Sequence, residues 1–158
     1  MSRFMLLGAV MLACLPAVAR AGVIYEYDDG TAETYGGAAG APLAWMVHFT
    51  VQPGGDTINA VQISLHEACS FEAVVWEDIN GLGDPADARV LSRTPYTGAV
   101  GLNTVPISPV TVSGSFFVGA YTSSAGYPIN ADTSGCAPHR SWVSASSTGL
   151  DLNDLTKA

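Results

Sequence analysis

The chain has 158 residues, a length that suits one domain with a core of its own. Six basic residues stand against 14 acidic ones, giving a formal charge of −8. This excess disfavours nucleic acids and anionic membrane surfaces as partners, because lysine and arginine supply most of the attraction to both. The 17 glycines and nine prolines argue against long helices.

Residues 1–21 have the three parts of a secretory signal peptide. Arg3 gives the positive start, Phe4–Leu15 is apolar, and Ala19–Ala21 forms a small-x-small cleavage site. The apolar stretch is shorter than the roughly 20 residues that span a bilayer. We therefore predict a secreted, periplasmic or cell-surface protein. Lipidation at Cys14 is the second choice, since the apolar run continues past that cysteine.

Removal of residues 1–21 changes both the charge and the cysteine count. Four basic residues then remain against 14 acidic ones, a formal charge of −10. Cys69 and Cys136 become the only cysteines, and in an oxidising compartment we expect them to form a disulfide. That bond would close a loop of nearly half the chain and contribute about 4 kcal/mol. The alternative is two separate thiols.

Short apolar runs with period-two alternation predict strands after residue 21. The first is Val23–Tyr27 and the second is Leu43–Val51. In the second, alternation places Trp45, Val47, Phe49 and Val51 on one face and Met46, His48 and Thr50 on the other. A Pro-Gly-Gly-Asp turn at 53–56 precedes a run whose inward residues are Val61, Ile63 and Leu65. We predict a hairpin from these two runs.

About eight strands are expected in total. The later ones are Phe71–Glu77, Ala88–Arg93, Thr104–Ile107, Val110–Val112, Ser115–Tyr121 and Arg140–Ser144. Many short strands separated by turns predict an all-β fold, an antiparallel, jelly-roll-like β-sandwich over residues 22–158. Trp45 and Trp76, at strand centres, are expected in the core.

Four segments carry a resemblance to a known family. They are YDDGTAE at 27–33, WEDINGLGDP at 76–85, GSFFVG at 114–119 and RSW at 140–142. Together they resemble an uncharacterised accessory β-sandwich domain of secreted bacterial proteins, which occurs alone or beside hydrolases and sorting tails. The resemblance implies a closing strand after residues 151–155, so we expect either that this strand is missing and leaves an exposed sheet edge or that the sequence is truncated.

An acidic loop follows Trp76. Asp78, Asn80, Asp84 and Asp87 offer oxygen ligands of the kind calcium prefers. The spacing departs from an EF-hand, because an arginine stands where the last carboxylate belongs. A calcium-stabilised structural domain is therefore one hypothesis. The other is an interstrand loop whose Asn-Gly and Asp-Pro pairs form turns.

A second acidic group lies near the start of the mature chain. Glu26, Asp28, Asp29 and Glu33 alternate with tyrosines, a mixture suited to sugar or cation binding. A pair of carboxylates that face each other can also catalyse glycoside hydrolysis. A secreted hydrolase that uses these N-terminal carboxylates is therefore an alternative function. The remaining interpretation is that this segment is an edge strand followed by a polar loop, with no ligand-binding role.

The sequence contains no recognisable catalytic motif. We therefore expect an exported, non-enzymatic binding or structural module, with carbohydrate or another cell-surface polymer as the ligand class. The expected ligand-binding residues are Glu26, Asp28, Asp29, Tyr127 and Trp142, the last two as a stacking platform for sugar rings. We expect no cofactor, unless the acidic loop binds calcium.

Overall fold

A computed structural model describes residues 22–26, 31–123, 126–131, 140–153 and 155. The strands are β1 (Thr34–Gly36), β2 (Leu43–Thr50), β3 (Thr57–Leu65), β4 (Cys69–Glu77), β5 (Arg89–Gly98), β6 (Gly101–Thr111), β7 (Ser115–Thr122), β8 (Ile129–Ala131) and β9 (Ser141–Ala145). A short 3-10 helix, η1 (Pro85–Asp87), lies between β4 and β5. The described part of the chain is therefore almost entirely β, as the alternating pattern predicted.

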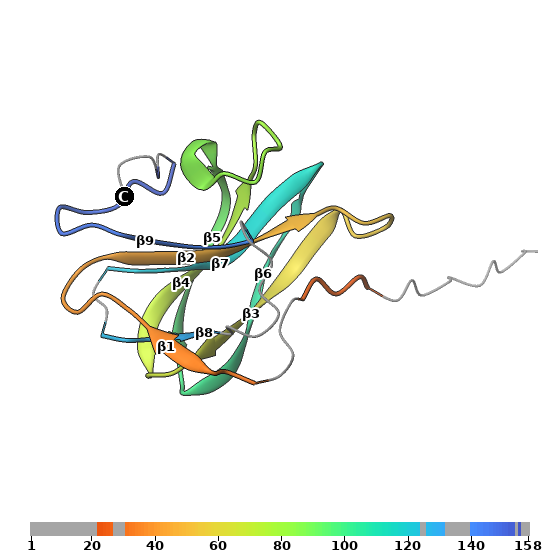
Figure 1. Cartoon of the computed structure of the whole chain (residues 1–158). Coiled ribbons are helices and arrows are strands. Elements are labelled where there is room, and N and C mark those ends of the chain that lie inside the picture. Colours follow the sequence, from red (N-terminus) through yellow and green to blue (C-terminus); the bar gives the residue numbers. More distant parts are fainter. Residues whose placement is uncertain (1–21, 27–30, 124–125, 132–139, 154, 156–158) are drawn as a thin grey trace, which may run out of the picture.

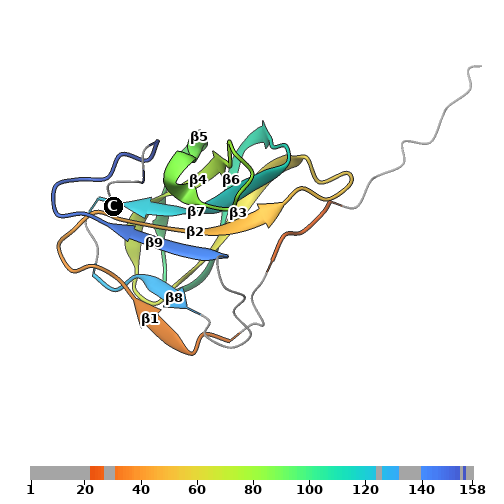
Figure 2. The same cartoon turned by 45° about the horizontal axis from the view of Figure 1, so that its top comes forward.

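The strands form two sheets that pack face to face (Figures 1 and 2). One sheet has four strands in the order β1-β8-β3-β6, and the other has five in the order β5-β4-β7-β2-β9. All the strand pairs are antiparallel. The predicted antiparallel β-sandwich is confirmed, and the described residues form nine strands where about eight were expected.

The predicted hairpin of β2 and β3 is wrong, because the two strands lie in different sheets. β2 pairs with β7 and β9, and β3 pairs with β6 and β8. The turn at 53–56 instead carries the chain from one sheet to the other. Tyr25 holds this crossover, since its hydroxyl donates to the Gly55 carbonyl (2.9 Å) and accepts from the Gln52 amide (2.8 Å).

Two further strand predictions need correction. Residues 23–26 of the expected first strand are not a strand, and Tyr27 lies outside the described residues. Instead, the Tyr25 ring packs edge-on against Phe49 and Phe116. The separate runs at 104–107 and 110–112 belong mainly to one long strand, β6, whose pairing with β3 shifts register near Ile58.

The space between the sheets holds the main core. Its buried side chains include Leu43, Trp45, Phe49, Val61, Leu65, Phe71, Val75, Val105 and Phe116. The inward faces predicted for the second and third runs are confirmed by these contacts. The expectation that Trp45 and Trp76 are buried is also confirmed.

A second apolar cluster lies on the outer face of the five-stranded sheet. We call it the outer cluster, and its buried members are Ala44, Met46, Val74, Trp76, Ala88, Phe117, Leu152 and Leu155. The last two belong to the C-terminal segment, which follows β9 and packs back onto the sheet. Trp76 anchors this segment, because its indole Nε1 donates to the Leu152 carbonyl over 3.0 Å. The five-stranded sheet therefore buries apolar side chains on both faces.

Gly119 lies in β7, at the centre of this sheet, where β7 passes close to β2. A Cβ atom built on Gly119 would lie 1.9 Å from the Trp45 carbonyl oxygen. We expect Gly119→Ala to lower the free energy of unfolding by about 1–3 kcal/mol, because the strands must separate to admit the methyl group. Urea titration measures this loss. Gly36→Ala is the matched control: its Cβ meets no atom within 4 Å, so an equal loss there would contradict the packing argument.

Candidate functional site

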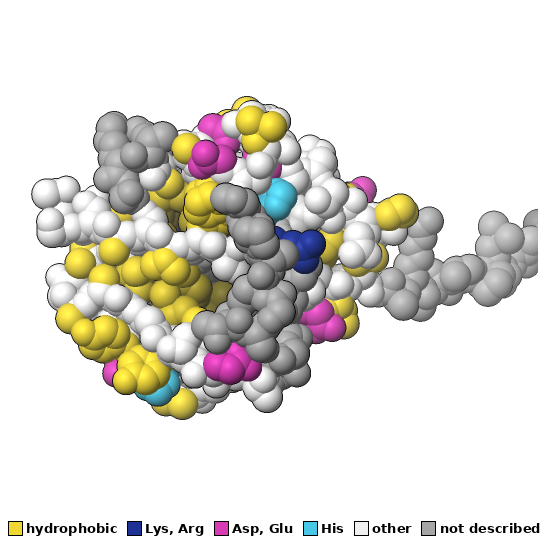
Figure 3. Space-filling view, in the orientation of Figure 1, with side chains coloured by type: hydrophobic (Ala, Val, Ile, Leu, Met, Phe, Trp, Pro, Cys, Tyr) yellow, Lys and Arg dark blue, Asp and Glu magenta, His cyan; other side chains and the backbone are white. Residues whose placement is uncertain are grey.

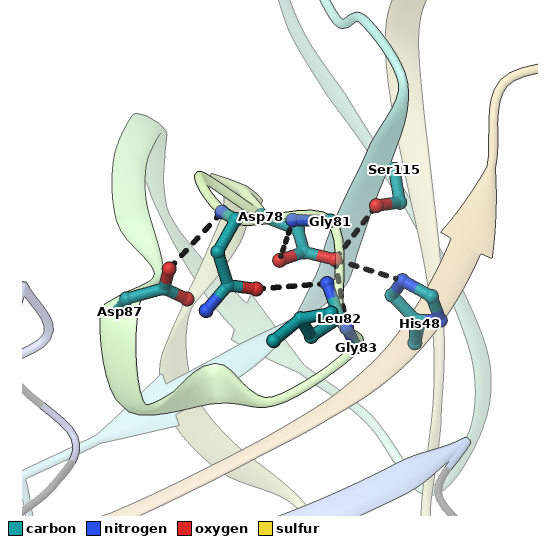
Figure 4. Close-up of polar contacts among 8 residues, drawn as sticks. His48, Asp78, Gly81, Leu82, Gly83, Asp87 and Ser115 are labelled. Atoms are coloured by element: carbon teal, nitrogen blue, oxygen red, sulfur yellow. Dashed lines mark hydrogen bonds and ion pairs between the residues drawn. The ribbon is translucent and has the colours of Figure 1, made fainter.

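Asp78 organises the loop that follows β4 (Figure 4). Its side chain is fully buried. Oδ2 accepts hydrogen bonds from the Ser115 hydroxyl (2.6 Å) and the Gly83 amide (3.0 Å), and it lies 3.2 Å from His48 Nε2. Oδ1 accepts from the Gly81 amide over 3.0 Å. One carboxylate thus ties the loop to both β2 and β7.

The environment of Asp78 favours its charged form. Burial alone would raise the pKa of this carboxyl group, but hydrogen bonds from Ser115, Gly83, Gly81 and His48 outweigh it and hold the pKa below its ordinary value. Gly81 and Gly83 have φ of +72° and +75°, a left-handed conformation that favours glycine. The two glycines thereby present their amides to one carboxylate.

The other predicted calcium ligands also accept hydrogen bonds from loop amides. Asn80 Oδ1 accepts from the Leu82 amide (2.8 Å), and Asp87 Oδ2 accepts from the Asn80 amide (3.0 Å). Asp84 Oδ1 accepts from the Ala86 amide (2.9 Å) and so caps η1. Among the described residues, no three His, Cys, Asp or Glu side chains are grouped as metal ligands would be. Calcium binding stays a prediction.

A separate group of exposed rings lies beside the four-stranded sheet. Tyr35 of β1 stacks on His66, with centroids 4.2 Å apart and planes 5° from parallel. Tyr127 meets Tyr35 edge-on at 6.3 Å. Tyr35 is 57% exposed and Tyr127 is 47% exposed. We call these three residues the tyrosine–histidine cluster.

Backbone contacts hold this cluster in place. The Tyr127 amide donates to Glu67 Oε2 over 2.9 Å, and the His66 amide donates to the Pro128 carbonyl over 2.9 Å. Next to it, Asn130 Nδ2 donates to the Ser64 hydroxyl over 2.9 Å. Figure 3 shows hydrophobic side chains gathered around a histidine at the lower left of the molecule, near β1 and β8. The result is an exposed aromatic surface with carboxylate, amide and hydroxyl groups at its border.

The structure separates the residues that the sequence grouped as ligand-binding. Tyr127 belongs to the tyrosine–histidine cluster, whereas Trp142 lies in β9 of the other sheet and packs against the outer cluster. Glu26 is exposed and lies beside the end of β2 and the residues that follow it. Glu33 precedes β1 and accepts from the Thr31 hydroxyl over 3.0 Å. Asp28 and Asp29 lie outside the described residues.

Tyr35 and His66 were not predicted as site residues. Their contact joins residues 31 positions apart, and it depends on the pairing of β1 with β8 and of β8 with the end of β3. No local pattern in the sequence carries that information. The tyrosines that alternate with the N-terminal carboxylates were the one available signal.

Cys69 is half-buried and has a free thiol in the structure, while Cys136 lies outside the described residues. The disulfide therefore stays a prediction. Burial, and then the negative charge of Glu67, raise the pKa of the Cys69 thiol.

The described part of the chain contains no helix long and apolar enough to cross a membrane. In comparisons with known proteins, the chain matches no family model, no curated protein and no solved structure.

Proposed function

We propose that this protein is an exported, non-enzymatic binding module whose ligand is a carbohydrate. The observation that supports the proposal is the tyrosine–histidine cluster. An exposed tyrosine ring covers the apolar C–H face of a sugar, and its hydroxyl remains available for hydrogen bonding. Two such rings are present, 57% and 47% exposed. Glu67 and Asn130 lie beside them and supply acceptors and donors for sugar hydroxyls.

The negative charge of the protein favours neutral carbohydrates over acidic ones. The chain carries a formal charge of −8, and Glu67 borders the cluster itself. Polymers of uronic acids or sulfated sugars would be repelled by this field. The ligand class is therefore a neutral glycan of the cell surface or extracellular matrix.

Replacing Tyr35 by alanine tests the proposal. We expect wild-type protein to bind at least one of laminarin, galactomannan and xyloglucan in affinity gel electrophoresis, and polygalacturonate not at all. Tyr35→Ala should weaken binding about tenfold, equivalent to about 1.4 kcal/mol of lost ring contact.

Leu102→Ala is the matched control, because Leu102 is 65% exposed on β6 and lies outside the cluster. It should bind as the wild type does. A protein that binds none of the neutral polysaccharides, or a Tyr35→Ala variant that binds as well as the wild type, would refute the proposed function.

A further inference from the structure

A groove of about 530 Å³ lies where β4 begins and β5 and β7 end. Ser70, Glu72, Tyr96, Thr97 and Tyr121 line it. Ser70 and Thr97 face each other across the β4–β5 pair, and both are exposed. The groove thus combines the Ser70 and Thr97 hydroxyl groups with the Tyr121 ring, whereas the Tyr96 ring packs against Phe71 in the main core.

The groove carries little net charge. Among the described residues that line the groove, Glu72 is the only carboxylate, and both of its oxygens accept hydrogen bonds from the Arg93 guanidinium, over 2.5 and 2.9 Å. The same guanidinium lies 5.7 Å from the centre of the Tyr121 ring. The carboxylate is therefore neutralised by a paired cation, and the lining suits an uncharged, hydroxyl-rich ligand.

Groove and cluster lie close together. Ser70 follows Glu67 by three residues, so their Cα atoms are at most about 11 Å apart. Ser123, also in the groove lining, precedes Tyr127 by four residues, a reach of at most about 14 Å. Residues 67–70 lead into the start of β4, and the segment from Ser123 to Tyr127 follows the end of β7. Because β4 and β7 are antiparallel neighbours, these two strand ends lie at the same edge of the sheet. A glycan chain of a few sugar units can therefore contact both places.

We propose that the ligand is an extended neutral glycan chain that runs from the tyrosine–histidine cluster into this groove. The inference rests on the proposed function and adds the length of the ligand and a second contact region. The cluster stacks one part of the chain, and the groove holds the following part through the Tyr121 ring and the Ser70 and Thr97 hydroxyls.

Filling the groove tests the inference. Isothermal titration calorimetry would compare laminarin, galactomannan and xyloglucan with the di- and trisaccharide fragments of each. The polymer should bind about tenfold more tightly than its fragments. Thr97→Trp and Ser70→Trp, both at exposed positions, should each reduce the polymer affinity to that of the fragments and leave fragment binding unchanged.

Thr104→Trp is the control, because Thr104 is exposed on β6 in the other sheet. Circular dichroism verifies that each variant is folded. If polymer and fragments bind equally, or if both groove variants that fold bind polymer as the wild type does, the extended site is refuted while the proposed function stands. If no neutral glycan of any length binds, the proposed function itself fails and this inference fails with it.

Discussion

Replacing Trp76 by alanine is expected to lower the free energy of unfolding by about 3–5 kcal/mol. Trp76 is completely buried in β4 and faces the outer cluster. Truncation removes its contacts with that cluster and leaves the Leu152 carbonyl without its indole donor. The C-terminal segment should then detach from the sheet, because its anchor is lost.

Urea unfolding followed by far-ultraviolet circular dichroism measures this effect without relying on tryptophan fluorescence. Trp76→Phe is the matched control, since it keeps an aromatic ring and loses the hydrogen bond, worth about 1 kcal/mol, and some volume. Proteolysis of the C-terminal segment should accelerate in the alanine variant. Equal stability of Trp76→Ala and wild type would refute the role assigned to the outer cluster.

Replacing Asp78 by alanine should have a comparable effect, a loss of about 3–5 kcal/mol. The substitution leaves the Ser115 hydroxyl and the Gly81 and Gly83 amides without their acceptor. Each unsatisfied buried donor costs about 1–3 kcal/mol, reduced where water enters the loop. Urea titration at neutral pH measures the loss. Asp56→Ala, at an exposed acidic residue, is the control and should change stability little.

The Asp78 contribution should depend on pH in a defined direction. Its pKa in the folded protein lies below the ordinary carboxyl value of about 3.9. The charged form is therefore stabilised by folding, and this stability is fully present above about pH 4. It is lost as the pH falls through the folded-state pKa. The stability difference between wild type and Asp78→Asn should narrow from about pH 7 to about pH 3; a constant difference would contradict the assignment.

Strand faces could be predicted from the sequence, but strand partners could not. Alternation correctly separated Trp45 and Phe49 from Met46, because successive side chains on a strand point to opposite faces. Val74 and Trp76, two positions apart on β4, share the outer cluster for the same reason. The hairpin prediction failed because a short turn at 53–56 is equally compatible with a crossover between sheets. Pairing is decided by contacts between residues far apart in the sequence.

The same limit applied to the candidate site. Tyr127 could be proposed from its type and its place beside a loop, but its neighbours Tyr35 and His66 are assembled by strand register. The segment after Trp76 was predicted to be an acidic loop, and it connects β4 to β5. Within this loop, Asp78 accepts hydrogen bonds from two glycine amides. These bonds depend on backbone conformations that the composition of the loop does not reveal.

The contact between Trp76 and Leu152 spans 76 residues, and it has a consequence for the order of assembly. During synthesis β4 emerges long before the segment that covers its outer face. Val74 and Trp76 therefore lack the cover of Leu152 and Leu155 until those two residues have been synthesised. Contacts of such long range form slowly, and exposed apolar strands invite aggregation in the meantime. The nascent chain should consequently be more prone to aggregation before Leu152 and Leu155 have been synthesised than after they pack onto β4.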